Sequence, residues 1–333
     1  MQYTKMGKAN VDVSRVCLGT MHFGPKTDER ESFRIMDRAL DMGINFFDTA
    51  NIYGGAKGPG ATEEIVGKWF AQGGKRNRVV LATKVYHSMT GKQEPNEAMG
   101  ISRYKIRRHL DDSLKRLQTD RVELYQVHHI DRQITTEEFW DAFSFHMDRG
   151  EIAYVGTSNF PGWGLTKFDT AAHARGQLGI VSEQTQYNLL SRYPELEVIP
   201  AAGDRGIGLM PYMPLGGGLL TGNVSPEKGS RTAEVAAEYG LPPLDQFSPL
   251  IEYRKLCDEL GENPTAVAIA WVLHNPVVYS AIVGVRTEAQ LDHLERASEL
   301  SLSEDVLARL DAMFPYTANR ALAQGPAPEA FAW

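Results

Sequence analysis

Three observations indicate that this sequence forms a (β/α)8 TIM barrel. Short apolar runs rich in β-branched and aromatic residues alternate with longer segments of helical period along most of the 333 residues. Strict alternation of this kind requires a parallel sheet, and eight such units fit a closed barrel better than an open doubly wound sheet. No Pro/Ser-rich linker interrupts the pattern, so we expect residues 1–333 to form a single domain.

The predicted strands are short and regular, and each is followed by a helical segment with a polar face and plausible caps. The strands cover residues 16–18, 44–47, 79–83, 122–127, 152–155, 180–183, 207–211 and 279–283. The helices cover about residues 28–42, 62–72, 102–117, 135–149, 162–175, 195–204, 264–274 and 287–299.

Three stretches fall outside this alternation, and a typical barrel of about 250 residues leaves room for them. We expect an N-terminal β-hairpin before residue 15, an insertion in the Gly/Pro-rich segment 216–249, and an extra C-terminal helix after the barrel. Prolines and alanines dominate residues 316–333, which predicts a loosely ordered tail.

Composition excludes several classes of function. A net charge of −7 and a pI near 5.8 do not favour nucleic-acid binding, and the basic cluster 103–108 is best explained as a solvated helix face. No apolar run is long enough for a membrane span, and the first ten residues lack a secretory signal pattern. The two cysteines form no CxxC or Cys/His cluster, so we expect a reducing compartment and a cytoplasmic protein.

Polar side chains follow nearly every predicted strand, at the end that carries the active site in such barrels. Asp48 and Tyr53 follow the second strand, Lys84 the third and His128 the fourth. Later strand ends add Ser158, Asn159, Gln184, Tyr212 and Arg286. A packed core alone does not require these groups.

The first four side chains suit proton transfer to a carbonyl oxygen. A phenol has a pKa of about 10, and a nearby cation such as Lys84 would favour its ionised form. Asp48 would hold Lys84 and keep it protonated, while His128 could orient the carbonyl or carry a proton. No side chain donates hydride, so this chemistry implies a cofactor.

Simpler interpretations exist for each member of the set. Asp48 and Lys84 fit a structural ion pair equally well, and Tyr53 fits an ordinary loop aromatic. Because neighbouring strand residues point to opposite faces, we expect that His128 and His129 do not bind one ion together, and we predict no metal site.

The cofactor site cannot be the usual dinucleotide turn, because the sequence contains neither GxGxxG nor GxxxxGK[ST]. Barrels often bind phosphate with the loops after their last two strands, here residues 214–220 and 284–287, although the glycine-rich stretch also fits a flexible loop. Tyr212 could stack on a nicotinamide whose carboxamide would bond Ser158, Asn159 and Gln184. Arg286 and the helix beginning near Thr287 would favour a 2′-phosphate, hence NADP(H).

These motifs together resemble the aldo-keto reductases over nearly the whole chain. The segments that carry the resemblance are 43–50 (GINFFDTA) with Tyr53-Gly54, 82–85 (ATKV), 124–128 (LYQVH), 156–160 (GTSNF), Gln184 with 187–189 (YNL), and 212–219. The resemblance implies reversible NADP(H)-linked reduction of an aldehyde, ketone or sugar carbonyl, with NAD(H) as the open alternative and no metal.

The resemblance also implies roles for individual residues. The catalytic residues would be Asp48, Tyr53, Lys84 and His128. The cofactor would contact Gly19, Thr20, Met21, Asp48, Ser158, Asn159, Gln184, Tyr212, Met213, Pro214, Leu215, Gly216, Gly218, Leu219, Gly284, Val285, Arg286 and Gln290. The substrate would contact His22, Phe23, Tyr53, Tyr86, His128 and Phe160.

The sequence departs from the family pattern in two places. Leu294 stands where relatives often have an asparagine that contacts adenine, which weakens the preference for NADP over NAD. The glycine-rich loop 54–61 is longer than in the simplest relatives. Residues 125–131 and 182–184 are similar to bacterial members that reduce deoxysugar intermediates.

Two other functions compete with a reductase that acts on a small carbonyl compound. A regulatory subunit that binds NADP(H) and senses redox state has relatives in the same family. A metal-dependent barrel hydrolase would need more carboxylate and histidine ligands at the strand ends. The sequence makes no prediction of the oligomeric state.

Overall fold

A parallel barrel of eight strands forms the centre of the computed structural model, which describes residues 1–91 and 94–316. In sheet order the strands are β10 (Ala281–Gly284), β3 (Val16–Gly19), β4 (Phe46–Asp48), β5 (Val80–Val85), β6 (Val122–Val127), β7 (Ile152–Ser158), β8 (Ile180–Gln184) and β9 (Gly208–Leu209). The barrel closes between β9 and the segment that enters β10, where Leu209 N donates to Val277 O (2.8 Å) and Tyr279 N donates to Leu209 O (3.0 Å). The predicted (β/α)8 fold is confirmed.

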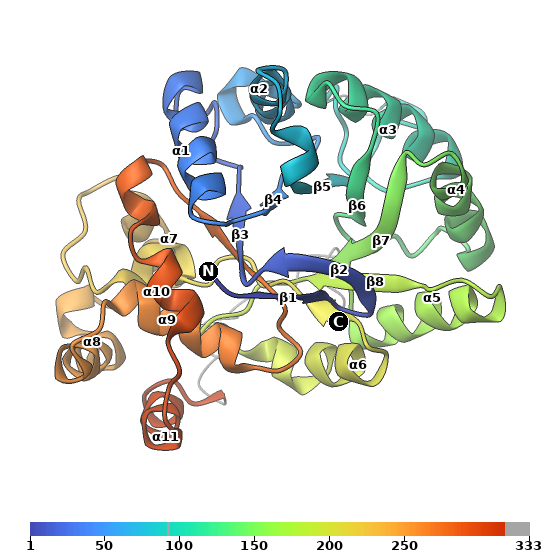
Figure 1. The fold of residues 1–333 in the computed structure, drawn as a ribbon. Coiled ribbons are helices and arrows are strands. Elements are labelled where there is room, and N and C mark those ends of the chain that lie inside the picture. Colours follow the sequence, from blue (N-terminus) through green and yellow to red (C-terminus); the bar gives the residue numbers. More distant parts are fainter. Residues whose placement is uncertain (92–93, 317–333) are drawn as a thin grey trace.

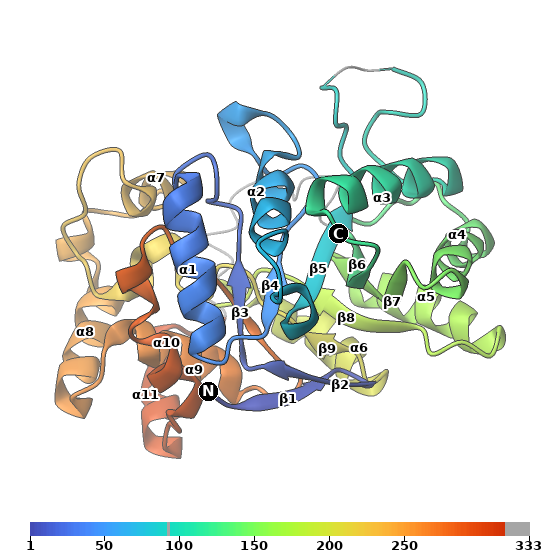
Figure 2. The same ribbon diagram turned by 45° about the horizontal axis from the view of Figure 1, so that its top comes forward.

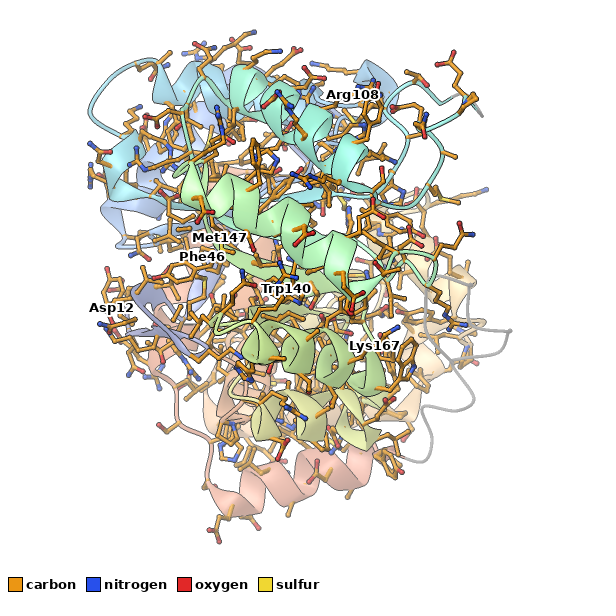
Figure 3. The ribbon with its side chains drawn as sticks, turned by 90° about the vertical axis from the view of Figure 1, so that its right-hand side faces the viewer. Asp12, Phe46, Arg108, Trp140, Met147 and Lys167 are labelled. Carbon is orange, nitrogen blue, oxygen red and sulfur yellow. The ribbon has the colours of Figure 1, made fainter. Side chains whose placement is uncertain are left out.

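A ring of helices surrounds the strands (Figure 1). It comprises α1 (Glu29–Asp41), α2 (Ala61–Phe70), α3 (Arg103–Leu117), α4 (Thr136–Asp148), α5 (Gly162–Ala174), α6 (Val198–Asp204), α9 (Pro264–His274) and α10 (Leu294–Glu299). Figure 3 shows α3 to α6 side by side over the outside of the barrel. Side chains of Asp28, Ser102 and Thr135 cap α1, α3 and α4 by accepting from a backbone N–H three residues on.

The segments outside the alternation contain more helix than predicted. The Gly/Pro-rich insertion includes α7 (Arg231–Glu238), and α8 (Ser248–Leu260) follows it directly. Ser230 caps α7 and Gly261, in the left-handed conformation, ends α8, so local signals exist that the glycines and prolines obscured. The extra C-terminal helix is confirmed as α11 (Glu304–Met313), while the predicted tail lies, apart from Tyr316, outside the described residues.

The explanation of the basic cluster 103–108 as a solvated helix face is wrong for Lys105. This side chain is 3% exposed and donates to the backbone carbonyls of Tyr86 and Ala98, each at 2.6 Å. Burial lowers its pKa to about 8. Lys105 therefore fixes the loop that follows β5 against α3.

The N-terminal hairpin closes one end of the barrel. Its strands β1 (Tyr3–Met6) and β2 (Ala9–Ser14) cross in front of the barrel in Figure 1 and lie below it in Figure 2. The turn between them contains Gly7 with φ +54, where an added Cβ would lie 2.1 Å from Val181 O and 2.6 Å from Gly208 N. Only glycine allows the hairpin to approach the starts of β8 and β9 so closely.

Two apolar cores result from the alternation of side chains along the strands. The inner core fills the hairpin end of the barrel with Met6, Val13, Phe46, Leu124 and Val181 among others. The outer core lies between the strands and the helices and includes residues such as Phe47, Tyr125 and Trp140. The inner core stops at the level of Phe46, Ala82 and Leu124. Within the described residues no helix has the length and apolarity that a membrane span needs.

Candidate active site

Polar side chains replace the inner apolar core at the other end of the barrel. Phe46, Ala82 and Leu124 point inward, so two residues further along the same strands Asp48, Lys84 and Gln126 also point inward. Gln184 reaches the same cluster from the end of β8. All four side chains are buried, so each needs a partner inside the barrel.

Lys84 links the carboxylate to the phenol. Its Nζ donates to Asp48 Oδ2 at 2.6 Å, to Thr49 O at 2.9 Å and to Tyr53 Oη at 3.2 Å. These three bonds use all three ammonium protons. Because Tyr53 Oη accepts the proton of Lys84, its own O–H is left to point elsewhere.

Two glutamines complete the surroundings of Asp48. Gln126 Nε2 and Gln184 Nε2 each donate to Asp48 Oδ1 at 3.0 Å, and Gln184 also donates to Gln126 Oε1 at 3.3 Å. Our sequence analysis missed Gln126. Its place two residues before His128, in the same inward phase as Leu124, was the signal that could have identified it.

The electrostatic balance keeps Lys84 charged and Tyr53 protonated. Burial is the largest single influence and would lower the pKa of Lys84, but Asp48 and Tyr53 together outweigh burial and the pKa lies above its usual value. Burial raises the pKa of Tyr53, even though Lys84 pulls that pKa the other way. The expected net lowering by Lys84 is therefore absent, because desolvation of the phenolate is the larger effect. At neutral pH the site holds an ammonium beside a neutral phenol.

His128 contacts the phenol from the bend that follows β6. Its ring lies 5.9 Å from the Tyr53 ring, centroid to centroid, in an edge-on arrangement. Burial and the nearby Lys84 charge keep the pKa of His128 well below its usual value, so the imidazole is neutral. The four predicted catalytic side chains thus meet at one end of the barrel.

The expectation that His128 and His129 point to opposite faces is wrong. β6 ends at Val127, and both histidines lie in a bend where strand alternation no longer applies. Their rings stack at 5.2 Å with an angle of 9° between the planes. Together with His87 they place one ligand nitrogen each within 4.8 Å of one another.

Tyr212 and Asn159 connect the nicotinamide side of the predicted cofactor site to His128. Tyr212 Oη donates to Asn159 Oδ1 at 3.0 Å, and Asn159 Nδ2 donates to His128 O at 3.1 Å and to Ser158 Oγ at 3.1 Å. Ser158 and Gln184 are register partners on β7 and β8. The residues predicted to hold the carboxamide are therefore neighbours, and Asn159 N donates directly to Gln184 O at 2.9 Å.

The glycine-rich loop after β9 has backbone geometry suited to an anion site. Gly216, Gly217 and Gly218 have φ of +56, +67 and +101, and Met213 before them has φ +53. Gly216 N and Gly218 N donate to Met213 O and Leu215 O within the loop, at 2.9 and 3.0 Å, so what the glycines supply is close approach of the backbone. An added Cβ on Gly217 would lie 2.6 Å from Val235 Cγ2, so α7 packs directly against the loop.

Cations gather near the loop after β10. Burial, then Arg286, Arg231 and Lys26, lower the pKa of His22 to about 4, which places three positive charges close to this one ring. Sequence analysis identified Arg286 but missed Lys26 and Arg231, which come from distant segments with no local motif. Gln290 Oε1 accepts from Arg286 N at 2.7 Å, so it orders the loop that carries Arg286.

Other predicted contacts have varied surroundings. Thr20 N and Oγ1 donate to Asp48 O at 3.0 and 2.9 Å, next to Gly19, and Met21 is 51% exposed. Of the predicted substrate contacts, Tyr86 packs edge-on against His87 and His129, whereas Phe23 and Phe160 are buried in the outer core. The remaining cofactor predictions lie in the two loops, with Leu219 and Val285 buried, Pro214 and Leu215 beside the glycines, and Gly284 against His22. Leu294, at the doubtful adenine position, is buried in the outer core.

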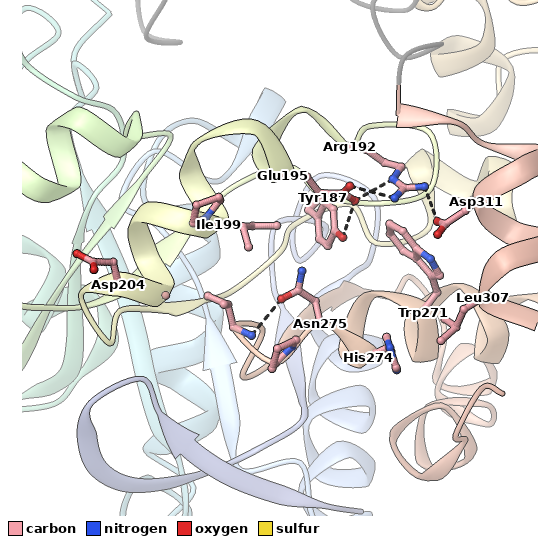
Figure 4. A pocket seen from close by; sticks show the side chains of 14 residues that line it. Tyr187, Arg192, Glu195, Ile199, Asp204, Trp271, His274, Asn275, Leu307 and Asp311 are labelled. Carbon is pink, nitrogen blue, oxygen red and sulfur yellow. Dashed lines mark hydrogen bonds and ion pairs between the residues drawn. The ribbon is translucent and has the colours of Figure 1, made fainter. Parts of the chain in front are cut away.

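A cavity of about 580 Å³ lies elsewhere, among the outer helices (Figure 4). None of its lining residues belongs to the cluster around Lys84. Arg192 in its wall bonds Glu195 at 2.8 Å and Asp311 at 2.6 Å and lies over the Trp271 ring. Arg192 is thus held by two carboxylates of the wall, and this cavity is remote from the cluster around Lys84.

Comparison with known proteins gives consistent matches across the chain. The model of the Aldo/keto reductase family matches residues 15–314. "Uncharacterized oxidoreductase YrpG" of Bacillus subtilis is 50% identical, with 100% of both chains covered. "Aldo-keto reductase YhdN" of the same organism is 33% identical over 92% of this chain and 91% of its own. A "Probable voltage-gated potassium channel subunit beta" of Arabidopsis thaliana is 32% identical over 90% of this chain and 92% of its own.

Proposed function

The chain belongs to the aldo/keto reductase family and is an oxidoreductase of carbonyl compounds, and from that premise we propose that it reduces an aldehyde, ketone or sugar carbonyl with NADP(H), using Tyr53 as the general acid. One observation carries the proposal. Lys84 Nζ bonds the Asp48 carboxylate and the Tyr53 phenol at the same time. A structural ion pair would not need the second bond.

In this mechanism the protein supplies a proton and a charged environment. As negative charge grows on the carbonyl oxygen, Tyr53 gives up its proton to that oxygen, and the Lys84 ammonium stabilises the phenolate that remains. Asp48, held by Gln126 and Gln184, keeps Lys84 charged and in place. The neutral His128 is able to donate a hydrogen bond that orients the carbonyl.

The residues present fit a nicotinamide dinucleotide phosphate. The left-handed glycines let the backbone of the loop approach a pyrophosphate closely, and Lys26, Arg231 and Arg286 supply charge for a further phosphate. Tyr212 and Ser158 would hold the nicotinamide end beside Tyr53. When bound, the reduced nicotinamide supplies the hydride.

One observation supports the alternative function, a regulatory subunit that binds NADP(H). A relative that covers most of the chain is named as a potassium channel subunit beta. The complete set of bonds at Lys84 favours a working reductase, and multiple turnovers distinguish the two functions. Cofactor oxidised in large molar excess over protein supports the reductase; a single slow turnover per chain supports the regulatory subunit.

Cofactor titration tests the phosphate assignment. Quenching of protein fluorescence by NADPH and by NADH gives the two affinities for the wild-type protein and for Arg286→Ala and Arg231→Ala. Each charged bond to phosphate stabilises by about 1.5–3 kcal/mol, so each variant should lose about 10- to 100-fold in NADPH affinity. NADH affinity should change little, and Arg309→Ala on α11 is the control. Equal losses for both cofactors would contradict the assignment.

A further inference from the structure

Three histidines form a cluster beside the proposed catalytic phenol. The ring centroids of His87 and His128 lie 5.0 Å apart, those of His87 and His129 lie 5.2 Å apart, and those of His128 and His129 lie 5.2 Å apart. His87 follows β5, and the other two follow β6. The proposed carbonyl reduction uses one of these imidazoles, so the other two need a separate explanation.

The cluster has electron pairs available for a ligand. The three side chains are half-buried, and each ring lies directly against the other two. A neutral imidazole has one nitrogen lone pair, which is the donor that zinc prefers. Nδ1 of His128 is buried and has no hydrogen-bond partner among the described residues.

From this geometry we propose that His87, His128 and His129 bind one divalent transition-metal ion of the Zn²⁺ class at the mouth of the site. Three nitrogens on a tetrahedral zinc lie about 3.4 Å apart, given Zn–N distances of about 2.1 Å. The nitrogens here lie within 4.8 Å of one another, and the stacked rings of His128 and His129 must turn so that their in-plane lone pairs meet at one ion.

The surroundings allow the charge of the ion. Two buried cations act on the cluster, Lys84 on His128 and His129 and Lys105 on His87. Lys84 is the one next to the proposed catalytic phenol. Its ammonium is paired with Asp48 at 2.6 Å, which offsets most of its repulsion. The fourth position of the ion would be left to water or to an oxygen of a small molecule.

Metal binding would compete with carbonyl reduction. An ion on the cluster ties up His128 and occupies space next to Tyr53, so we infer that Zn²⁺ inhibits turnover reversibly and competes with the carbonyl substrate. This consequence rests on the proposed function, whereas the binding itself does not. Direct binding measurements therefore separate failure of the metal site from failure of the reductase assignment.

The test uses the tag-free full chain, first stripped with a chelator. Calorimetric titration with Zn²⁺ should give one ion per chain, and Co²⁺ should give the intense visible absorption of a four-coordinate ion. His87→Gln and His129→Gln should each weaken binding at least about tenfold, because each removes a ligand. His22→Gln, a histidine at the same end of the barrel but outside the cluster, is the matched control.

The outcomes decide the proposal on binding alone. Thermal unfolding checks that each variant is folded, and a folded His87→Gln variant that binds Zn²⁺ as tightly as the wild type overturns the site. Equal weakening by His22→Gln also overturns it, because binding would then be spread over surface histidines. Tight binding with unchanged carbonyl turnover keeps the site and overturns only the inhibition.

Discussion

The two ends of the barrel interior differ in chemistry although the same strands build both. At the hairpin end, Phe46 and Leu124 point inward into an apolar core. Two residues further on, Asp48 and Gln126 point inward into a hydrogen-bonded cluster around Lys84. One alternation of side chains along the strands therefore supplies both the inner core and the polar site. The change from apolar to polar inward residues marks the boundary between the two.

Removing the central charge should have the largest effect. Lys84→Met leaves the buried Asp48 carboxylate without its counter-ion, which costs about 3–5 kcal/mol of folding free energy. It also removes the ammonium from Tyr53, so carbonyl reduction should fall by at least about 100-fold. Urea unfolding and steady-state NADPH oxidation measure the two effects.

A surface pair provides the control for that variant. Lys68 pairs with Glu29 at 2.7 Å, and its side chain is 53% exposed. Lys68→Met should change stability by less than about 1 kcal/mol and leave turnover unchanged. Similar losses for the two variants would mean that the polar end is no different from an ordinary ion pair.

At the hairpin end, Phe46→Ala should reduce stability without reducing chemistry. The ring is fully buried, so its removal costs about 3–5 kcal/mol. Because Phe46 lies below the cluster and contacts the inner core, kcat per folded molecule should stay within about twofold of wild type. A large loss of kcat with retained folding would show that the two ends are not separable.

A substitution at Gln126 tests whether this side chain positions Asp48. Gln126→Leu removes one donor from Asp48 and one acceptor from Gln184, which costs about 1–3 kcal/mol. If Gln126 positions Asp48, turnover should fall while NADPH affinity stays unchanged. Gln72→Leu, at an exposed position, should alter neither quantity. Unchanged turnover in a folded Gln126→Leu variant would remove this residue from the positioning role.

A pH effect is expected from the outward-facing acid next to Gln184, Glu183. Burial raises the pKa of Glu183 to about 8, although Thr157 Oγ1 and Phe160 N both donate to it, at 2.5 and 3.0 Å. Between the ordinary pKa of a glutamate and about 8, the folded protein therefore keeps a proton on Glu183 that the unfolded chain releases. Stability contributed by this group should be full at acid pH and fall as pH rises through about 8.

Glu183→Gln should remove that part of the pH dependence. The amide stays neutral and can still bond Thr157 and Phe160. The unfolding free energy of the variant, measured with urea, should therefore vary less between about pH 5 and about pH 8 than that of the wild type. Glu227→Gln, at an exposed position, should reproduce the wild-type slope. An identical slope in Glu183→Gln would mean that Glu183 is ionised in the folded protein.

Sequence pattern was enough to predict the strands and the polar strand ends, because both depend on local periodicity. The six residues of β6 were predicted without error, and Asp48, Tyr53, Lys84 and His128 do meet. Features that depend on tertiary approach were missed. Lys26 and Arg231 come together near His22 only through folding.

The histidine pair shows where local rules stop. Side chains alternate between two faces only inside a strand. The prediction applied this alternation to His128 and His129, which lie past Val127 in a bend. The insertion shows the opposite error. Glycines and prolines suggested loop, but α7 forms there because Ser230 caps it and because Val235 packs against Gly217.

The most direct measurement of the central claim compares Tyr53→Phe with the wild type in NADPH-linked carbonyl reduction. The substitution removes only the hydroxyl that bonds Lys84, so NADPH affinity by fluorescence should stay within about twofold, and kcat should fall at least about 100-fold on every accepted aldehyde, ketone or sugar. Tyr104→Phe, 58% exposed on α3, is the control. Wild-type turnover in a folded Tyr53→Phe variant would contradict the assignment of this phenol as the proton donor.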